Sequence, residues 1–171
     1  MPAAVPPHKE APDDPGAGAR VEMCRLAIGG DPRFEVSTLE VERGGPSYTA
    51  DTLREIHEKA PGDDLTFIVG GDMAHSFPTW HQPAEVVRLA RLGVAEREGA
   101  AREDIAARVA EVPGADGRVT FFDLPRVDVS SSLIRRRVAE GRPIRFLVPD
   151  AVADYIAARG LYRSAVGIPE R

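Results

Sequence analysis

The sequence predicts an α/β fold built on a mostly parallel sheet. Segments patterned as strands alternate with segments patterned as helices along most of the chain, which favours strand–helix–strand units. Residues 65–69 (LTFIV) form a nearly continuous apolar run that ends at two glycines, as strands buried on both faces of a parallel sheet do. The length of 171 residues fits one domain. We expect a single domain over residues 1–171, with a proline-rich loop over 1–19 and a tail over 164–171.

Periodicity and the residues that interrupt it predict the individual elements. A helix through Leu53 and Ile56 is expected to be capped by Ser47 or Thr49. Apolar spacing predicts further helices at residues 21–28, 83–89, 103–112, 131–140 and 151–159. Alternation and short apolar runs predict strands at residues 34–41, 65–69, 92–95 and 119–124.

Composition and charge exclude several classes of protein. The formal net charge is −5, so the chain has no bulk positive field to attract a nucleic acid or an anionic membrane surface. Cys24 is the single cysteine, which excludes an internal disulfide, and we expect it to be a small core residue. No apolar run approaches the roughly 20 residues that span a bilayer. We therefore expect a cytoplasmic location.

The end of the predicted strand at residues 65–69 is a candidate ligand site. Ligands bind beyond the carboxyl ends of strands in open α/β sheets. Gly70 and Gly71 would let a ligand approach the backbone, and Asp72 could hold ribose hydroxyls. The alternative is a tight turn in which Asp72 caps the following helix.

The only tryptophan of the chain, Trp80, lies in a predicted loop just after that strand. An exposed aromatic face can stack on a flat heterocycle, although a single tryptophan more often serves packing. His75 and His81 have no carboxylate partner at a useful spacing, so we expect both to be exposed. The two interpretations of Trp80 stay open at this point.

Residues 129–137 (VSSSLIRRR) place three serines before an arginine-bearing helix. One interpretation is that Ser130 to Ser132 do no more than cap the helix. Free amides at a helix N-terminus, adjacent hydroxyls and Arg135 one turn later would also form a phosphate site. A stiff loop at residues 6–9 (PPHK) could present His8 and Lys9 to an anion. Signature motifs of dehydrogenases, P-loop NTPases, zinc proteases and α/β-hydrolases do not occur in the sequence.

Taken in order, these segments closely resemble bacterial nicotinate-mononucleotide adenylyltransferases. The matching segments are residues 6–9 (PPHK), 46–53 (PSYTADTL), 67–72 (FIVGGD), 77–80 (FPTW), 129–135 (VSSSLIR), 147–150 (LVPD) and 160–162 (GLY). The resemblance implies a single nucleotidyltransferase domain with a Rossmann-like open parallel sheet and helices on both faces. It implies transfer of AMP from ATP to nicotinate mononucleotide, giving deamido-NAD and pyrophosphate in NAD biosynthesis, with Mg²⁺ arriving on ATP.

The resemblance also implies roles in binding the mononucleotide. Trp80 would stack on the pyridine ring, and Thr49 would receive the nicotinate carboxylate. The backbone near Tyr48 and His81 would donate amides to the same carboxylate. The cations implied around the carboxylate or the mononucleotide phosphate are His8, Lys9 and Arg97.

For ATP, the resemblance implies that Gly70 and Asp72 hold the adenosine ribose. Ser130, Ser132 and Arg135 would bind the phosphates at their helix N-terminus. Of these residues, Ser130 and Arg135 are implied in catalysis. No metal ligand is expected from the protein, because Mg²⁺ would be held mainly by the phosphates of ATP.

The sequence departs from the family pattern in one respect. The family begins with a strand, a Gly-Gly-Thr-Phe-Asp-Pro-like turn and a His-x-Gly-His motif whose histidines contact the ATP phosphates. None of His8, His57, His75 and His81 lies in such a motif, so we expect the first strand–helix unit to be missing. The alternatives are an inactive nucleotide-binding remnant or an adenylyltransferase acting on another phosphate ester. The sequence also leaves open whether the chain forms a homo-oligomer.

Overall fold

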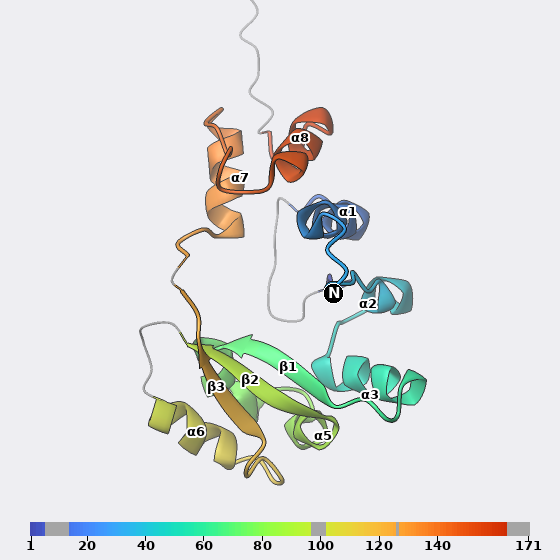
Figure 1. Cartoon of the computed structure of the whole chain (residues 1–171), viewed down its shortest axis with the longest axis vertical. Coiled ribbons are helices and arrows are strands. Elements are labelled where there is room, and N and C mark those ends of the chain that lie inside the picture. The colour runs from blue at the N-terminus through green and yellow to red at the C-terminus, as the bar shows by residue number, and fades with distance from the viewer. Residues whose placement is uncertain (6–13, 97–101, 126, 164–171) are drawn as a thin grey trace, which may run out of the picture. The chain divides into compact units, whose positions relative to one another are not determined.

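The computed structural model describes residues 1–5, 14–96, 102–125 and 127–163 (Figure 1). The chain divides into two compact units, each of which is described by itself. Met1–Ser47 and Asp128–Arg171 form the first unit, and Tyr48–Val127 form the second. The single domain over residues 1–171 therefore stays a prediction. No helix in the described part of the chain is long and apolar enough to cross a membrane.

The second unit contains an open sheet of three parallel strands in the order β1–β2–β3. The strands are β1 (Leu65–Gly70), β2 (Ala90–Glu96) and β3 (Val119–Asp123). In this register Phe67 lies opposite Leu92, and Val94 lies opposite Phe121, so their side chains share one face. The predicted α/β class with a parallel sheet is confirmed.

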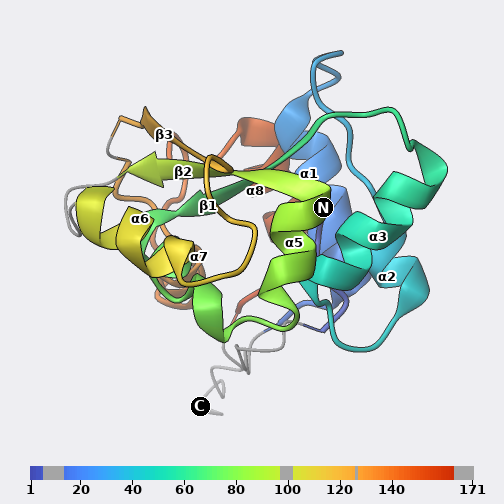
Figure 2. The same cartoon turned by 90° about the horizontal axis from the view of Figure 1, so that it is seen from below.

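The helices of the second unit lie on that same face of the sheet (Figure 2). They are α3 (Thr49–Lys59), α4 (Gly71–His75), the short 3₁₀ helix η1 (Phe77–Thr79), α5 (Pro83–Leu89) and α6 (Arg102–Ala110). Phe77, Leu92 and Val94 are fully buried in the resulting core. On the opposite face, Ile68 is 66% exposed. The covering of that second face by helices stays a prediction.

The first unit is helical where it is regular. Its helices are α1 (Ala17–Ile28), α2 (Leu39–Arg43), α7 (Ser131–Ala139) and α8 (Asp150–Ala158). Helices α1 and α8 pack against each other. A separate apolar core forms around Ile134, Ile144, Val152 and Ile156, with Met23 of α1 packed against it.

The predicted strand at residues 34–41 is wrong. Residues 34–38 are irregular and Phe34 is 60% exposed, whereas α2 begins at Leu39. A strand needs a neighbouring strand to bond its backbone, and no described strand pairs with this segment. Thr38 instead starts a helical turn, because its carbonyl accepts the amide of Glu42 at 2.9 Å.

Two further expectations about the first unit are corrected. Helix α1 begins at Ala17, within the loop predicted over residues 1–19. Cys24 is exposed on α1 rather than buried in the core, and Val21 is the buried residue of this helix.

The prediction that Ser47 or Thr49 caps the helix containing Leu53 is also wrong. Tyr48 occupies the N-cap position of α3, and no side chain caps the helix there. The hydroxyl of Ser47 is engaged elsewhere, since it accepts the amide of Ala4 at 2.9 Å.

Candidate functional site

Two residues predicted to bind the substrate meet in the second unit. The rings of Tyr48 and His81 lie 4.4 Å apart between centroids, with 33° between their planes. Tyr48 precedes α3 and His81 follows η1, so the contact joins two segments that are distant in sequence. Thr49, the first residue of α3, is half-buried beside Tyr48 in the chain. The contact between the Tyr48 and His81 rings therefore brings the start of α3 next to the segment after η1.

Trp80 is half-buried and packs against the core of the second unit. Its ring meets Phe77 at 5.3 Å and Phe67 at 6.0 Å, both in edge-on geometry. The indole nitrogen lies 3.4 Å from the hydroxyl of Ser76. These contacts set the orientation of the indole and leave part of it accessible. Packing and ligand stacking are therefore compatible at this position.

The end of β1 continues directly into α4. Gly70 is the N-cap residue of α4 and is exposed, and a Cβ atom at this position would meet no atom within 4 Å. At Gly71 a Cβ would lie 3.3 Å from the Cδ1 of Ile105, so α4 packs closely on α6 there. Asp72 is exposed in the first turn of α4. The alternative that Asp72 is the N-cap is wrong, whereas the open space beside Gly70 is compatible with a ligand.

In the first unit, Ser130 is the N-cap of α7, and its hydroxyl accepts the amide of Leu133 at 3.1 Å. Ser132 is exposed in the first turn, and its hydroxyl accepts a hydrogen bond from the Arg135 guanidinium at 3.3 Å. The first amides of a helix have no intrahelical acceptor. These amides, the Ser132 hydroxyl and Arg135 gather donors at one end of α7, which suits an anion.

Two hollows adjoin Arg135 in the first unit. One has a volume of about 520 Å³ and is lined by Ser132, Arg135 and Arg136. The other has a volume of about 510 Å³ and is mostly apolar, with Met23 among the residues on its wall. Tyr162 lines both hollows, and its burial raises the pKa of the phenol above its ordinary value.

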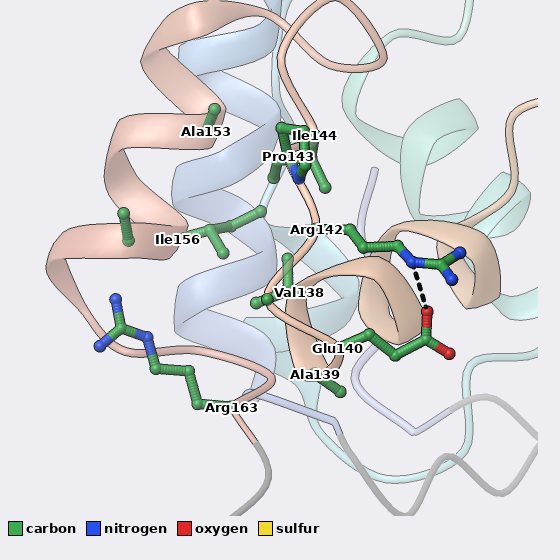
Figure 3. A pocket seen from close by; sticks show the side chains of 11 residues that line it. Val138, Ala139, Glu140, Arg142, Pro143, Ile144, Ala153, Ile156 and Arg163 are labelled. Carbon is green, nitrogen blue, oxygen red and sulfur yellow. Dashed lines mark ion pairs between the residues drawn. The ribbon is translucent and has the colours of Figure 1, made fainter.

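A third hollow, of about 760 Å³, lies between the end of α7 and α8 (Figure 3). Val138, Ile144 and Ile156 form its apolar wall, and Glu140 pairs with Arg142 at 3.3 Å beside it. Among the described residues, none that was predicted as a site residue lines this hollow. It is therefore separate from the donors at the start of α7.

Three predicted residues, His8, Lys9 and Arg97, lie outside the described residues. His75 and His81 are exposed, as expected. Within the described ranges no three His, Cys, Asp or Glu side chains are grouped so that they could hold a metal ion.

Sequence reasoning missed Tyr162, Arg54 and Gln82. Tyr162 and Gln82 adopt positive φ angles of 61° and 50°, which bulky residues rarely do. Arg54, in α3, donates a hydrogen bond to the side chain of Gln82, the residue before α5. Tyr162 lies in the family segment at residues 160–162, but the segment assigned it no role. The left-handed angles and the Arg54 contact have no local signal, because each depends on groups brought together by folding.

The chain matches a family model over most of its length. Residues 1–137 match the model described as cytidylyltransferase-like. The three parallel strands with helices on one face agree with this class of nucleotidyltransferase.

Curated relatives narrow the class. A protein of Thermomicrobium roseum, named probable nicotinate-nucleotide adenylyltransferase, is 43% identical over 96% of this chain and 76% of its own length. A protein of Geobacillus kaustophilus with the same name is 39% identical over 100% of this chain and 74% of its own length. The chain belongs to the nicotinate-nucleotide adenylyltransferase family.

Solved structures agree on the fold. Nicotinic acid mononucleotide adenylyltransferase of Plasmodium falciparum, complexed with NaAD, superposes with a TM-score of 0.70 at 19% identity. The match covers 93% of this chain and 78% of the other. The Rossmann-like nucleotidyltransferase fold is therefore confirmed.

Proposed function

We propose that this chain transfers AMP from ATP to the phosphate of nicotinate mononucleotide, giving deamido-NAD and pyrophosphate. The observation that carries the proposal is the 43% identity, over 96% of the chain, to a relative named for this activity. The geometry adds support, because each unit presents one kind of group that the reaction requires. The second unit offers aromatic rings for a flat heterocycle, and the first offers donors for phosphates.

The mononucleotide would bind at the cluster of Tyr48, Thr49, Trp80 and His81. The accessible part of the Trp80 ring would stack on the pyridine, while the contacts with Phe67 and Phe77 hold the indole in place. Thr49 and the amides near Tyr48 and His81 would receive the nicotinate carboxylate. His8, Lys9 and Arg97 would add positive charge around the carboxylate or the phosphate.

ATP would use two sets of residues. Gly70 and Asp72 would hold the adenosine ribose at the end of β1, where the backbone is open to a ligand. Ser130, Ser132 and Arg135 would bind the phosphates at the N-terminus of α7, whose dipole favours negative charge.

The chemistry needs positioning more than acid–base catalysis. An oxygen of the mononucleotide phosphate attacks the α-phosphorus of ATP, and the bond from that phosphorus to the bridging oxygen of pyrophosphate breaks. The nucleophile is already an anion, so no proton must be removed. Catalysis is then in-line alignment together with neutralisation of charge on the transferring group. Arg135 and the adjacent donors at Ser130 and Ser132 would supply that neutralisation.

Mg²⁺ would arrive with ATP, held mainly by the ATP phosphates, and would supply neutralisation of phosphate charge. Within the described ranges no three acidic or histidine side chains are grouped, so the phosphates of ATP would supply most of the ligands of the ion.

The test is to incubate the chain with ATP, Mg²⁺ and nicotinate mononucleotide. We expect deamido-NAD and pyrophosphate in equal amounts. Trp80→Ala should raise the KM for the mononucleotide about three- to tenfold, the size of one aromatic stacking contact, and leave the KM for ATP nearly unchanged. Phe146→Ala, at a position 89% exposed in the first unit, is the matched aromatic control.

Two results would contradict the proposal. Binding of the mononucleotide without any product would favour the inactive remnant. Adenylylation of a different phosphate ester, with none of nicotinate mononucleotide, would favour the other alternative. Equal effects of Trp80→Ala on both KM values would remove the stacking role.

A further inference from the structure

Gln82 has a backbone conformation that its sequence position disfavours. Its φ of 50° and ψ of 56° lie in the left-handed region, and it directly precedes Pro83. A residue other than glycine pays about 1–2 kcal/mol there, and a following proline favours extended backbone instead. Such a conformation persists only where the surroundings hold it. Gln82 also directly follows Trp80 and His81, which form part of the proposed mononucleotide site.

The main chain of Gln82 is held by α5. Its carbonyl accepts the amides of Glu85 at 3.0 Å and Val86 at 3.3 Å, so Gln82 starts the helix. The backbone angles of this residue therefore decide where the segment before α5 lies. A change in φ at Gln82 would move His81 and Trp80 relative to the helix.

The side chain of Gln82 is held by α3. The guanidinium of Arg54 donates to the Oε1 of Gln82 at 2.9 Å. The same guanidinium donates to the Oδ1 of Asp51 at 2.8 Å and lies 3.6 Å from the Oε1 of Glu85. Because a guanidinium is planar and rigid, three acceptors around it leave little freedom to turn. Arg54 therefore ties the start of α5 to α3.

Glu85 is an anion to which Arg54 can bind near neutral pH. A hydrogen bond from Arg88 lowers the pKa of the Glu85 carboxyl, and the charges of Arg88 and Arg54 lower it further against the opposing effect of burial. Arg88 hydrogen-bonds to Glu85, which is one of the three side chains that the Arg54 guanidinium contacts. The two arginines share one carboxylate, but Arg54 alone reaches Gln82.

A second contact joins the same two segments. Tyr48, the N-cap of α3, lies against His81 with ring centroids 4.4 Å apart. Arg54, farther along α3, holds Gln82. The segment from Trp80 to Gln82 is therefore attached to α3 at two neighbouring points, and α3 begins at Thr49.

We propose that Arg54 and Gln82 position Trp80 and His81 against Tyr48 and Thr49. The two sides of the mononucleotide site, the segment after η1 and the start of α3, then stay at a fixed distance from each other. The identity of the ligand rests on the proposed function, whereas the positioning does not. Arg54 is a positioning residue, because it contacts the segment and not the substrate. Its side chain is 39% exposed, and exposed ion pairs contribute little to stability. The contact should therefore affect binding more than folding.

The first measurement uses no ligand. Trp80 is the only tryptophan of the chain, so its fluorescence reports this segment alone. In Arg54→Ala and Gln82→Ala we expect acrylamide to quench Trp80 about two- to threefold more efficiently than in the unchanged chain, because a released segment exposes the ring. Arg88→Ala is the matched control, since it removes the other arginine bound to Glu85. It should leave quenching unchanged.

The second measurement titrates the same proteins with nicotinate mononucleotide and follows Trp80 fluorescence. Arg54→Ala and Gln82→Ala should each raise the Kd about three- to tenfold, the size of one hydrogen bond. The double variant should be no weaker than either single variant, because both act through one contact. Arg54→Lys keeps the positive charge but lacks the planar guanidinium, so its Kd should resemble that of Arg54→Ala. The urea midpoint of each variant shows that the chain remains folded.

The results separate this inference from the proposed function. If the unchanged chain does not bind the mononucleotide, the proposed function fails, and the acrylamide comparison still tests the positioning. If quenching in Arg54→Ala equals that of the unchanged chain, the positioning by Arg54 is refuted. Additive effects of the two substitutions on Kd would refute the coupling between Arg54 and Gln82.

Discussion

The hydroxyl oxygen of Ser130 accepts a hydrogen bond from the backbone amide of Leu133 at 3.1 Å, and this contact defines the start of α7. It satisfies one of the amides that have no acceptor within the helix. Ser132, two residues on, makes no such cap and instead contacts Arg135. The two serines thus have different structural roles within one short motif.

Ser130→Ala and Ser132→Ala should therefore differ in their effect on stability. Loss of the cap in Ser130→Ala should lower the free energy of unfolding by about 1 kcal/mol. Ser132→Ala should change it by less than about 0.5 kcal/mol, since its side chain is exposed, but should raise the KM for ATP. Urea denaturation and steady-state kinetics measure the two effects. Equal losses of stability would show that Ser132 also supports the fold.

Phe77 should be critical for the second unit. Its side chain is fully buried, and its ring supports Trp80 at 5.3 Å. Phe77→Ala should destabilise the protein by about 3–5 kcal/mol, because a large cavity forms in the core. Phe34→Ala, at a site 60% exposed, is the control and should cost less than about 0.5 kcal/mol. A loss near 1 kcal/mol for Phe77→Ala, measured by urea denaturation, would contradict this packing.

Tyr162 should make stability fall at high pH. Burial raises the pKa of its phenol in the folded protein, with an opposing effect of the nearby Arg135. The phenol is neutral in both states below its unfolded pKa of about 10. Above that pH the unfolded chain ionises first, so stability is lost as the pH rises from the unfolded pKa through the folded one.

Two measurements check this prediction. Phenolate absorbance of the folded chain should show one phenol that ionises later than a free tyrosine, and Tyr162→Phe should remove it. The same substitution should flatten the alkaline fall in the urea midpoint. An unchanged fall in Tyr162→Phe would assign the alkaline loss to another group.

The candidate site was predictable where neighbouring residues suffice to form it. The cap and donors at the start of α7 follow from residues 130–135 alone, and the structure shows them together. The edge-on contacts of Trp80 with Phe67 and Phe77 were not predictable, since they need β1 and η1 to pack. Whether Trp80 served packing or stacking therefore stayed open in the sequence.

The sequence by itself determines the longer helices, the buried strands and the family motifs, because a helix closes its hydrogen bonds within the segment and buried strands carry their own apolar pattern. The tertiary structure alone decides which potential strand finds a partner. Residues 34–38 alternate like a strand, yet they are irregular because no described strand bonds to them. It also decides the left-handed turn at Gln82, whose side chain accepts a hydrogen bond from Arg54 on another helix. Hydrogen bonds between distant segments leave no local pattern in the sequence.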